Sequence, residues 1–327
     1  MKRDHYGDLE SHSIVVVVPA YKVEREIGKV LRSMPGFVRH IVVVIDGSPD
    51  GTADSVEACV ADDQRIVMLN HERNRGVGAA VITGFREAIK LGADLIVKVD
   101  GDGQMAPEEI PDLLIPLVEG TADFSKGNRF RDLLTLARMP YIRRVGNMGL
   151  GFLAKAATGY WNIFDPTNGF FAARGELIKR LPLEKLDSSY YFEISLLSQL
   201  YFLGAVVRDL PMVARYGSEE SNLSVPRTLF EFPPKLMLTL MRRILLKYFI
   251  YDFSIVSIYV LGGIPLLAFG LIFGIINWIR FSTLGVAAPT GTVMLATLPV
   301  ILGFQLLLSA IGADLQAVPT NPRSNPM

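Results

Sequence analysis

The stretch "LIVKVDGDGQM", Leu95 to Met105, joins an apolar run to two aspartates that stand one residue apart. A run of apolar and β-branched residues predicts a buried strand, and the glycines that follow it allow a sharp turn. Three similar runs precede it, "IVVVVP", "HIVVVID" and "RIVMLN". Because these runs are continuously apolar rather than alternating, they predict strands that are covered on both faces.

Stretches with helical periodicity separate these runs, near residues 23–33, 52–62, 76–91 and 107–118. Alternating strands and helices predict an α/β fold with a mostly parallel, Rossmann-like sheet. Residues 120–225 are less regular, with a helix expected near 190–203 and a strand at "AVVRDLP", and they complete the same domain. Ligands of such sheets bind beyond the carboxyl ends of the strands, so the residues there are the candidate site.

The overall composition excludes several classes of function. The chain has 327 residues, half of them hydrophobic, and a formal net charge of zero, which argues against nucleic acid as a partner. Cys59 is the only cysteine and the four histidines lack metal-ligand spacing, so a disulfide and a Cys/His zinc site are excluded. A polar start followed by a short strand-like run does not resemble a signal peptide, so we expect the first domain in the cytosol.

The hydrophobic excess lies beyond residue 235. Residues 233–250, "PPKLMLTLMRRILLKYFI", carry four basic residues and no acidic one, which predicts an amphipathic helix on an anionic membrane surface. Two apolar spans follow, at about 254–279 and 292–313, and each is long enough to cross a bilayer. The alternative is an apolar hairpin that mediates oligomerisation of a soluble protein.

These features divide the chain into four parts. We expect a cytosolic catalytic domain at 1–225, an amphipathic juxtamembrane region at 226–253, two transmembrane helices within 254–313 and a disordered cytoplasmic tail at 314–327. The loop between the spans has one basic residue against four before them, so the positive-inside rule makes this an integral protein of the cytoplasmic membrane with a cytosolic catalytic domain. Small residues in the first span allow packing between subunits of a homo-oligomer: Gly262, Gly263 and Gly270.

Acidic residues follow two of the predicted strands. Asp100 and Asp102 end one strand and Asp46 ends another. Two carboxylates this close raise each other's pKa unless a cation offsets their repulsion. Mg²⁺ or Mn²⁺ would take their oxygens together with phosphate oxygens, and Gln104 would add a carbonyl oxygen. The alternative is that Asp100 and Asp102 only cap the turn into the next helix.

A glycine-rich loop, "NRGVGAAVITG" at 74–84, partly matches a dinucleotide-binding fingerprint. Val81 stands where the third glycine or alanine belongs, and the loop follows the third strand instead of the first. Close packing of the helix on the sheet explains these glycines equally well.

Six motifs, in this order and spacing, resemble the inverting enzymes of glycosyltransferase family 2: "VVVVPAY", "VVVIDGSPDGT", "NRGVGAAVITGF", "VKVDGDGQ", "GNRF" and "DPTNGFFAAR". The resemblance covers about residues 14–225 and is closest to polyprenyl-phosphate glycosyltransferases similar to dolichol-phosphate mannosyltransferase. It implies a GT-A fold, a nucleotide-sugar donor (a UDP-sugar or GDP-mannose) and a divalent metal. It also implies a polyprenyl phosphate acceptor, undecaprenyl or dolichyl, and inversion at the sugar.

The resemblance also implies roles for residues of this chain. Four of them would line the nucleoside: Pro19, Ala20, Tyr21 and Asp46. Three would hold the metal and the diphosphate: Asp100, Asp102 and Gln104. Three arginines, whose forked side chains match phosphate geometry, would face phosphates of donor or acceptor: Arg129, Arg144 and Arg215. Arg143 is nearly as good a candidate as Arg144, and Asp165 would lie beside the sugar or only shape its turn.

The chain departs from the family pattern in two places. Lys22 and Val23 follow Tyr21 where the family commonly has Asn-Glu, so the acidic contact falls to Glu24 or is missing. Glu220 stands where a lysine often precedes the serine, which puts in question the contact to the acceptor phosphate.

Two other functions stay open. A processive polysaccharide synthase of the same superfamily would carry a Gln-x-x-Arg-Trp motif, but neither Trp161 nor Trp278 follows an arginine. The other is a membrane-anchored nucleotide-binding subunit without turnover.

Overall fold

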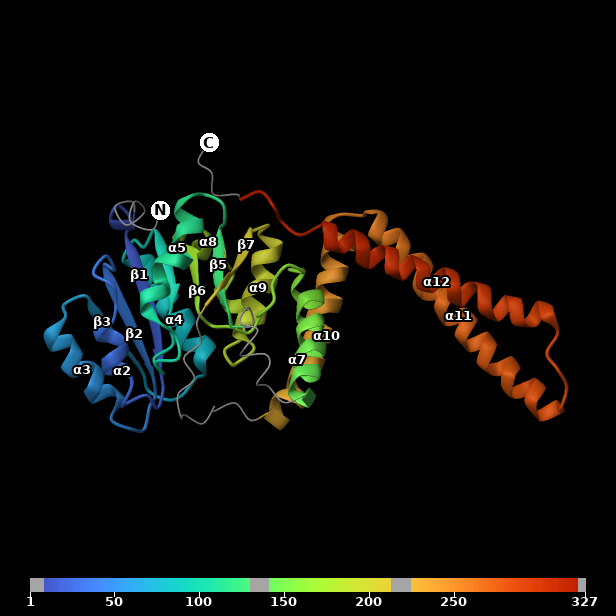
Figure 1. Ribbon diagram of the computed structural model, residues 1–327, viewed down its shortest axis with the longest axis horizontal. Helices are drawn as coiled ribbons and strands as arrows, with labels where there is room; N and C mark the ends of the chain where they lie inside the picture. The colour runs from blue at the N-terminus through green and yellow to red at the C-terminus, as the bar shows by residue number, and fades with distance from the viewer. Residues whose placement is uncertain (1–8, 130–140, 213–224, 323–327) are drawn as a thin grey trace. The chain divides into compact units, whose positions relative to one another are not determined.

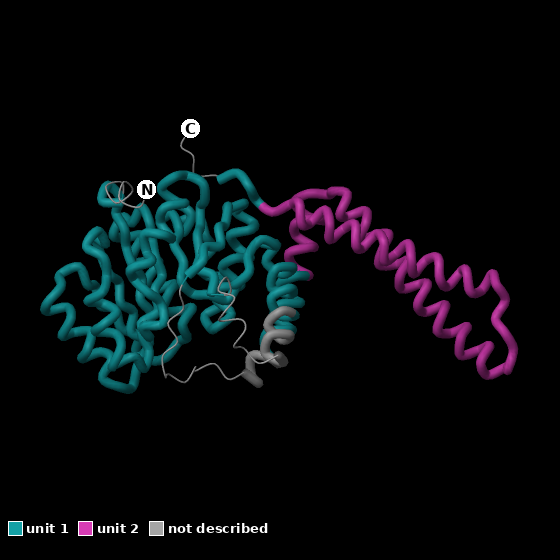
Figure 2. Tube along the Cα trace, in the orientation of Figure 1, with its two compact units in different colours: residues 1–240, 319–327 teal, residues 241–318 magenta. Residues whose placement is uncertain are grey.

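The computed structural model describes residues 9–129, 141–212 and 225–322, without the side chains of 141–148 and 225–230 (Figure 1). The chain divides into two compact units, one of residues 1–240 with 319–327 and the other of residues 241–318 (Figure 2).

A seven-stranded mixed sheet lies at the centre of the first unit, in the order β3-β2-β1-β4-β6-β5-β7 (Figure 1). Its strands are β1 (Ile14–Ala20), β2 (His40–Asp46), β3 (Ile66–His71), β4 (Leu95–Lys98), β5 (Phe124–Asn128), β6 (Phe171–Arg174) and β7 (Val207–Pro211). β6 alone is antiparallel to its neighbours β4 and β5. The predicted mostly parallel sheet is confirmed, and β5 and β6 are strands that the sequence patterns did not indicate.

Helices cover both faces of the sheet. The first face packs against α2 (Ile27–Arg32), α3 (Thr52–Asp62) and α5 (Ile110–Val118), the last of which follows a 3-10 turn at Pro107–Glu109. The second face packs against α4 (Val77–Lys90), where a Cβ on Gly84 would lie 2.2 Å from a methyl group of Val17. α9 (Phe192–Phe202) lies beside α4, with the rings of Phe85 and Phe192 6.2 Å apart, and it contacts the sheet where Glu193 Oε1 lies 3.7 Å from the Lys98 ammonium. Burial on both faces explains the continuous Val/Ile runs.

Two more helices complete the second half of the domain. They are α7 (Tyr141–Thr158) and α8 (Gly175–Arg180). Residues 120–225, whose sequence is less regular, therefore contain an 18-residue helix, and this helix includes the basic "YIRRVGN" stretch.

The predicted amphipathic helix is α10 (Val225–Leu245), which continues as a π-helical turn at Leu246–Tyr251. Leu236 is buried in a cluster with residues of α7 and α9, namely Ala154, Ala157, Tyr191 and Ile194. Next to it on the helix, large apolar side chains are exposed: Met237, Leu238, Met241 and Leu245. One side of α10 therefore packs on the catalytic domain, and another presents apolar groups outward. Of its basic residues, Arg242 is exposed, Lys235 pairs with Asp187 and Arg243 is buried.

The second unit contains α11 (Ile255–Leu284) and α12 (Thr290–Gln316), both long and apolar enough to cross a membrane. The two predicted spans are confirmed as helices of this kind, and α12 extends into the segment expected to be the tail. Glycines let the two helices approach within one chain: a Cβ on Gly270 would lie 2.8 Å from the Ala296 carbonyl oxygen, and one on Gly263 would lie 3.1 Å from that of Gly303.

A buried ion pair joins the end of α12 to α10. Both guanidinium Nη atoms of Arg243 donate to the carboxylate of Asp314, each at 2.8 Å. The Tyr248 hydroxyl donates to the same carboxylate, and all three side chains are buried. Removing one partner of such a pair leaves an uncompensated buried charge, which costs about 3 to 5 kcal/mol.

Replacing Asp314 by Ala should therefore lower the thermal unfolding midpoint of the detergent-solubilised chain, measured by circular dichroism. Arg243→Met combined with Asp314→Leu should recover most of the loss, because no unpaired charge remains. Asp252→Asn, at an exposed carboxylate in the same unit, is the control. A midpoint for Asp314→Ala equal to that of the control would contradict the prediction.

Candidate active site

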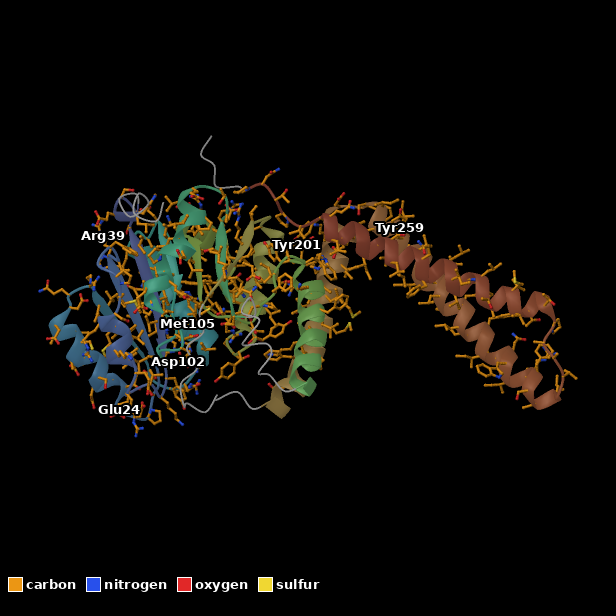
Figure 3. The ribbon with its side chains drawn as sticks, viewed as in Figure 1. Glu24, Arg39, Asp102, Met105, Tyr201 and Tyr259 are labelled. Carbon is orange, nitrogen blue, oxygen red and sulfur yellow. The ribbon has the colours of Figure 1, made fainter. Side chains whose placement is uncertain are left out.

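The carboxyl ends of β1 and β4 meet at one edge of the sheet. A Cβ placed on Gly101 would lie 3.2 Å from the carbonyl oxygen of Pro19, so the turn after β4 packs against the end of β1. Tyr21 follows directly and is half-buried. Figure 3 shows Asp102 at this edge, together with Glu24, and Arg39 at the opposite edge, where β2 begins.

Asp46, the last residue of β2, is buried and its carboxylate is bonded by the chain itself. Oδ1 accepts hydrogen bonds from the backbone N–H of Arg75 at 2.9 Å, and Oδ2 accepts from that of Gly76 at 2.8 Å. The His71 Nδ1 lies 2.6 Å from Oδ1, and its Nε2 lies 2.9 Å from the Thr83 hydroxyl. Asp46 therefore fixes the loop that leads into α4. Its contact with a nucleoside stays a prediction.

The glycine-rich loop is explained by close packing. Gly76 has a φ of +96°, and a Cβ there would lie 2.3 Å from the carbonyl oxygen of Ser188. A Cβ on Gly78 would lie 2.2 Å from the carbonyl oxygen of Asp187. The two glycines thus allow the start of α4 to contact the backbone that precedes α9.

The acidic pair follows β4, as predicted. Asp100 Oδ1 lies 2.5 Å from the ammonium of Lys98, and Asp102 Oδ1 accepts a hydrogen bond from the Gln104 backbone N–H at 3.0 Å. Burial, together with the nearby charge of Asp100, raises the pKa of Asp102. A second negative charge is therefore unfavourable at this place unless a cation accompanies it.

The residues at this edge suit a divalent cation that shares its ligands with phosphates. Among the described residues, no three His, Cys, Asp or Glu side chains converge on one point. The two carboxylates and the amide oxygen of Gln104 are hard oxygen donors and would supply part of a shell, which Mg²⁺ usually completes with water and phosphate oxygens. The raised pKa of Asp102 agrees with such an arrangement.

Arg129 and Asp165, both singled out from the sequence, lie together. The Arg129 Nε donates to Asp165 Oδ2 at 2.8 Å and its Nη2 donates to Oδ1 at 2.9 Å. The Asp165 side chain is fully buried, whereas that of Arg129 is 33% exposed. Asp165 therefore orients the guanidinium of Arg129, and charge-assisted bonds of this kind are strong.

The other predicted arginines are not placed at the site. Arg143 and Arg144 lie in the first turn of α7, but their side chains fall outside the described residues. Arg215 and Glu220 lie in segment 213–224, which the structure does not describe.

Glu24 binds a turn. Its Oε2 accepts a hydrogen bond from the Gly51 backbone N–H at 3.2 Å. Lys22 has a φ of 55°, in the left-handed region, and its N–H donates to the Ser48 hydroxyl at 2.8 Å. The sequence left open whether Glu24 takes over the acidic contact or the contact is missing. In the structure, Glu24 supports the turn after β2.

Charged residues missed in the sequence line the second face of the sheet. Lys98 on β4 and Lys126 on β5 both stand opposite Phe171 of β6, and Asp209 of β7 stands opposite Lys126. Burial lowers the pKa of Lys126 to about 8 and raises that of Glu193, which lies in the first turn of α9. A lysine inside an apolar strand pattern was the available signal, because lysine is rarely buried without a partner.

A mostly parallel sheet with one reversed strand, an acidic pair after β4 and an oriented arginine beside it define a glycosyltransferase of the GT-A class. The model of glycosyl transferase family 2 matches residues 15–181, just over half of the chain, and the chain belongs to this family. It is thus a family 2 glycosyltransferase enzyme, as the sequence motifs predicted.

Similar proteins act on lipid phosphates. The chain is 30% identical over 191 residues to the UDP-N-acetylglucosamine–dolichyl-phosphate N-acetylglucosaminyltransferase of Methanococcus voltae, covering 54% of this chain and 75% of the relative. It is 34% identical over 205 residues to the polyprenol monophosphomannose synthase of Mycolicibacterium smegmatis, covering 61% and 76%.

A solved structure shares the fold. Glucosyl-3-phosphoglycerate synthase from Mycobacterium tuberculosis, in complex with Mn²⁺, uridine diphosphate and glucosyl-3-phosphoglycerate, superposes with a TM-score of 0.54 at 22% identity. The match covers 72% of this chain and 83% of that chain. The predicted GT-A-like fold is confirmed.

Asp209 should make the stability of the folded domain depend on pH. Burial raises the pKa of Asp209 to about 6 from an ordinary value of 3.8, although Phe164 N–H donates to its Oδ2 at 2.8 Å. Because the folded state holds this proton more tightly, the carboxyl's contribution to stability is full below about pH 4 and is lost as the pH rises through about 6.

Asp209→Asn removes this titration. Relative to the native chain, the variant should gain stability as the pH rises from about 4 to about 7, by at most about 3 kcal/mol. Thermal unfolding midpoints at several pH values would measure the difference. Asp63→Asn is the control, because its bond to Arg65 lowers the pKa of Asp63, so its effect on stability changes below this pH range and stays constant within it. A difference that does not change between these pH values would contradict the prediction.

Proposed function

We propose that the protein transfers a sugar from a nucleotide-sugar donor to a polyprenyl phosphate, undecaprenyl or dolichyl, with inversion at the cytoplasmic face of the membrane. One observation carries the proposal: Asp100 and Asp102 lie at the sheet edge where Arg129 is held by Asp165, in a chain with two membrane-length helices. The relatives that act on dolichyl and polyprenol phosphates support the acceptor class.

The donor would bind at the ends of β1 and β2. Pro19, Ala20 and Tyr21 would line the nucleoside, beside the loop that Asp46 holds in place. One relative is named for a UDP-sugar and others for mannose transfer, so a UDP-sugar and GDP-mannose both fit the proposal.

Asp100, Asp102 and Gln104 would hold Mg²⁺ or Mn²⁺ against the diphosphate of the donor. A divalent cation there supplies Lewis-acid stabilisation of the charge that develops on the leaving diphosphate. The chain's own contribution is to present oxygen donors whose repulsion favours a cation.

The acceptor phosphate is already an anion near neutral pH, so no strong general base is required. Arg129, oriented by Asp165, would hold this phosphate, and Arg144 and Arg215 are proposed to assist. A phosphate oxygen then forms a bond to the anomeric carbon while the bond to the diphosphate breaks on the opposite face, so the sugar inverts. Such positioning of charge accounts for most of the catalysis in this proposal.

The membrane unit would bring the site to the lipid. α11 and α12 would span the bilayer with both ends in the cytoplasm, and the exposed apolar side chains of α10, together with Arg242, would lie among the head groups. The proposal keeps a catalytic domain at 1–225, a juxtamembrane region at 226–253 and two spans that begin near residue 254, and it places the cytoplasmic tail after the end of α12 at Gln316.

Membranes that contain the protein, supplied with labelled nucleotide sugars and a polyprenyl phosphate, should form a labelled glycolipid. A chelator should abolish the label, and added Mn²⁺ or Mg²⁺ should restore it. A polymer instead of a single-sugar lipid would favour the processive synthase. Absence of label with every donor would favour a nucleotide-binding subunit without turnover.

Asp102→Asn should reduce transfer by about 100-fold or more, because the cation loses a charged ligand. Membrane insertion should be unchanged, since Asp102 lies far along the chain from the two apolar helices. Asp62→Asn is the matched control, because Asp62 is an exposed carboxylate at the carboxyl end of α3. Full activity of Asp102→Asn would remove this residue from the metal site.

A further inference from the structure

Lys98 is a buried cation directly behind the acidic pair. Its side chain is 1% exposed, in a strand whose other residues are leucine, isoleucine and valine. Its ammonium lies 2.5 Å from Asp100 Oδ1 and 3.7 Å from Glu193 Oε1. One positive charge therefore links the acidic pair to the first turn of α9.

Gly169 leaves the space that the ammonium occupies. A Cβ at position 169 would lie 2.2 Å from the Lys98 Nζ, 3.1 Å from Glu193 Oε1 and 3.2 Å from an oxygen of Asp100. The glycine follows Asp165 in the same turn, so the segment that orients Arg129 also makes room for Lys98. Lys98 and Gly169 are thus a complementary pair.

Lys98 stays charged in this position. Two carboxylates face its ammonium, Asp100 Oδ1 at 2.5 Å and Glu193 Oε1 at 3.7 Å, and partners of opposite charge favour the charged form of a lysine. A charge this well enclosed is little screened by solvent and acts strongly on neighbouring ions.

We propose that Lys98 is a positioning residue of the sugar-transfer site: its ammonium, in the space left by Gly169, holds Asp100 and Glu193 together and weakens the binding of a divalent cation to the acidic pair. The inference rests on the proposed function. Its consequence is that the pair alone holds the cation weakly, so the donor's diphosphate has to supply part of the affinity. The cation then enters and leaves with the nucleotide.

Binding of Mn²⁺ to the detergent-solubilised full chain, measured without nucleotide by electron paramagnetic resonance of free Mn²⁺, tests this proposal. Lys98→Met keeps the length of the side chain and removes its charge, and should tighten Mn²⁺ binding by about tenfold or more. The sugar-transfer rate should fall, because Asp100 and Glu193 lose their common partner. A purely structural role for Lys98 would weaken cation binding instead.

Lys126→Met is the matched control. It removes the same charge from the same row of the sheet two strands away, about 10 Å from Lys98, so its effect on Mn²⁺ affinity should be much smaller. Gly169→Ala is a second route, because its Cβ would displace the ammonium without removing it. This variant should also tighten Mn²⁺ binding, and it keeps the test valid if Lys98→Met unfolds.

Unchanged or weaker Mn²⁺ binding in the folded Lys98→Met and Gly169→Ala variants would overturn the proposal. Absence of Mn²⁺ binding to native and variant chains alike would overturn it too, because Lys98 would then oppose no cation. Tighter Mn²⁺ binding in the variants, together with no sugar transfer by the native chain, would support the effect of Lys98 on cation binding and refute the proposed function. The two failures are therefore distinguishable.

Discussion

Carboxylates gathered at the buried end of a sheet repel one another, and the arrangement of the site follows from how each negative charge is offset. Asp46 is offset by backbone N–H groups at the start of α4. Asp165 is offset by the guanidinium of Arg129, and Asp100 by the ammonium of Lys98. The partners of Asp46 and Asp165 come from distant parts of the chain, so forming these pairs brings the loops of the site to defined positions. The electrostatic requirement and the geometry of the site are therefore the same constraint.

Asp102 differs from the other three carboxylates. Its Oδ1 accepts a hydrogen bond from the Gln104 backbone N–H within its own turn, and burial with the charge of Asp100 raises its pKa. A cation fixed to the chain at this place would also hold the product diphosphate after each transfer. An exchangeable divalent ion avoids that, because it leaves with the product. In the proposed reaction, a permanent charge at Lys98 and an exchangeable one at Asp102 therefore serve two different needs.

The first four strands, their helices and the two apolar spans were predictable, because continuous apolar runs report burial on both faces or in lipid. β5 and β6 were not, since "FSKGN" and "FAAR" are short and owe their strand conformation to pairing with distant segments. Asp100 and Asp102 followed from a predicted strand end with polar groups, whereas Arg129 and Asp165 followed from the resemblance to the family. Glu193 is different: it stands in a helix whose sequence shows no site pattern, and only packing of α9 on the sheet brings it to Lys98. Such cross-element contacts are set by the tertiary structure and leave no local trace.

A transferase that joins a water-soluble donor to a lipid phosphate has to fix its site relative to the membrane surface. In the proposed reaction, α10 would meet this need through contacts within the first unit that lead toward the donor side of the site. Lys235 pairs with Asp187 at 2.7 Å, and the hydroxyls of Tyr191 and Thr239 lie 2.9 Å apart. The backbone of Asp187 lies against Gly78, at the start of the helix whose preceding loop binds Asp46. A displacement of α10 would therefore move the turn that borders the proposed nucleoside site. In the proposed reaction, attachment of α10 to the lipid surface would thus be coupled to the shape of the donor site.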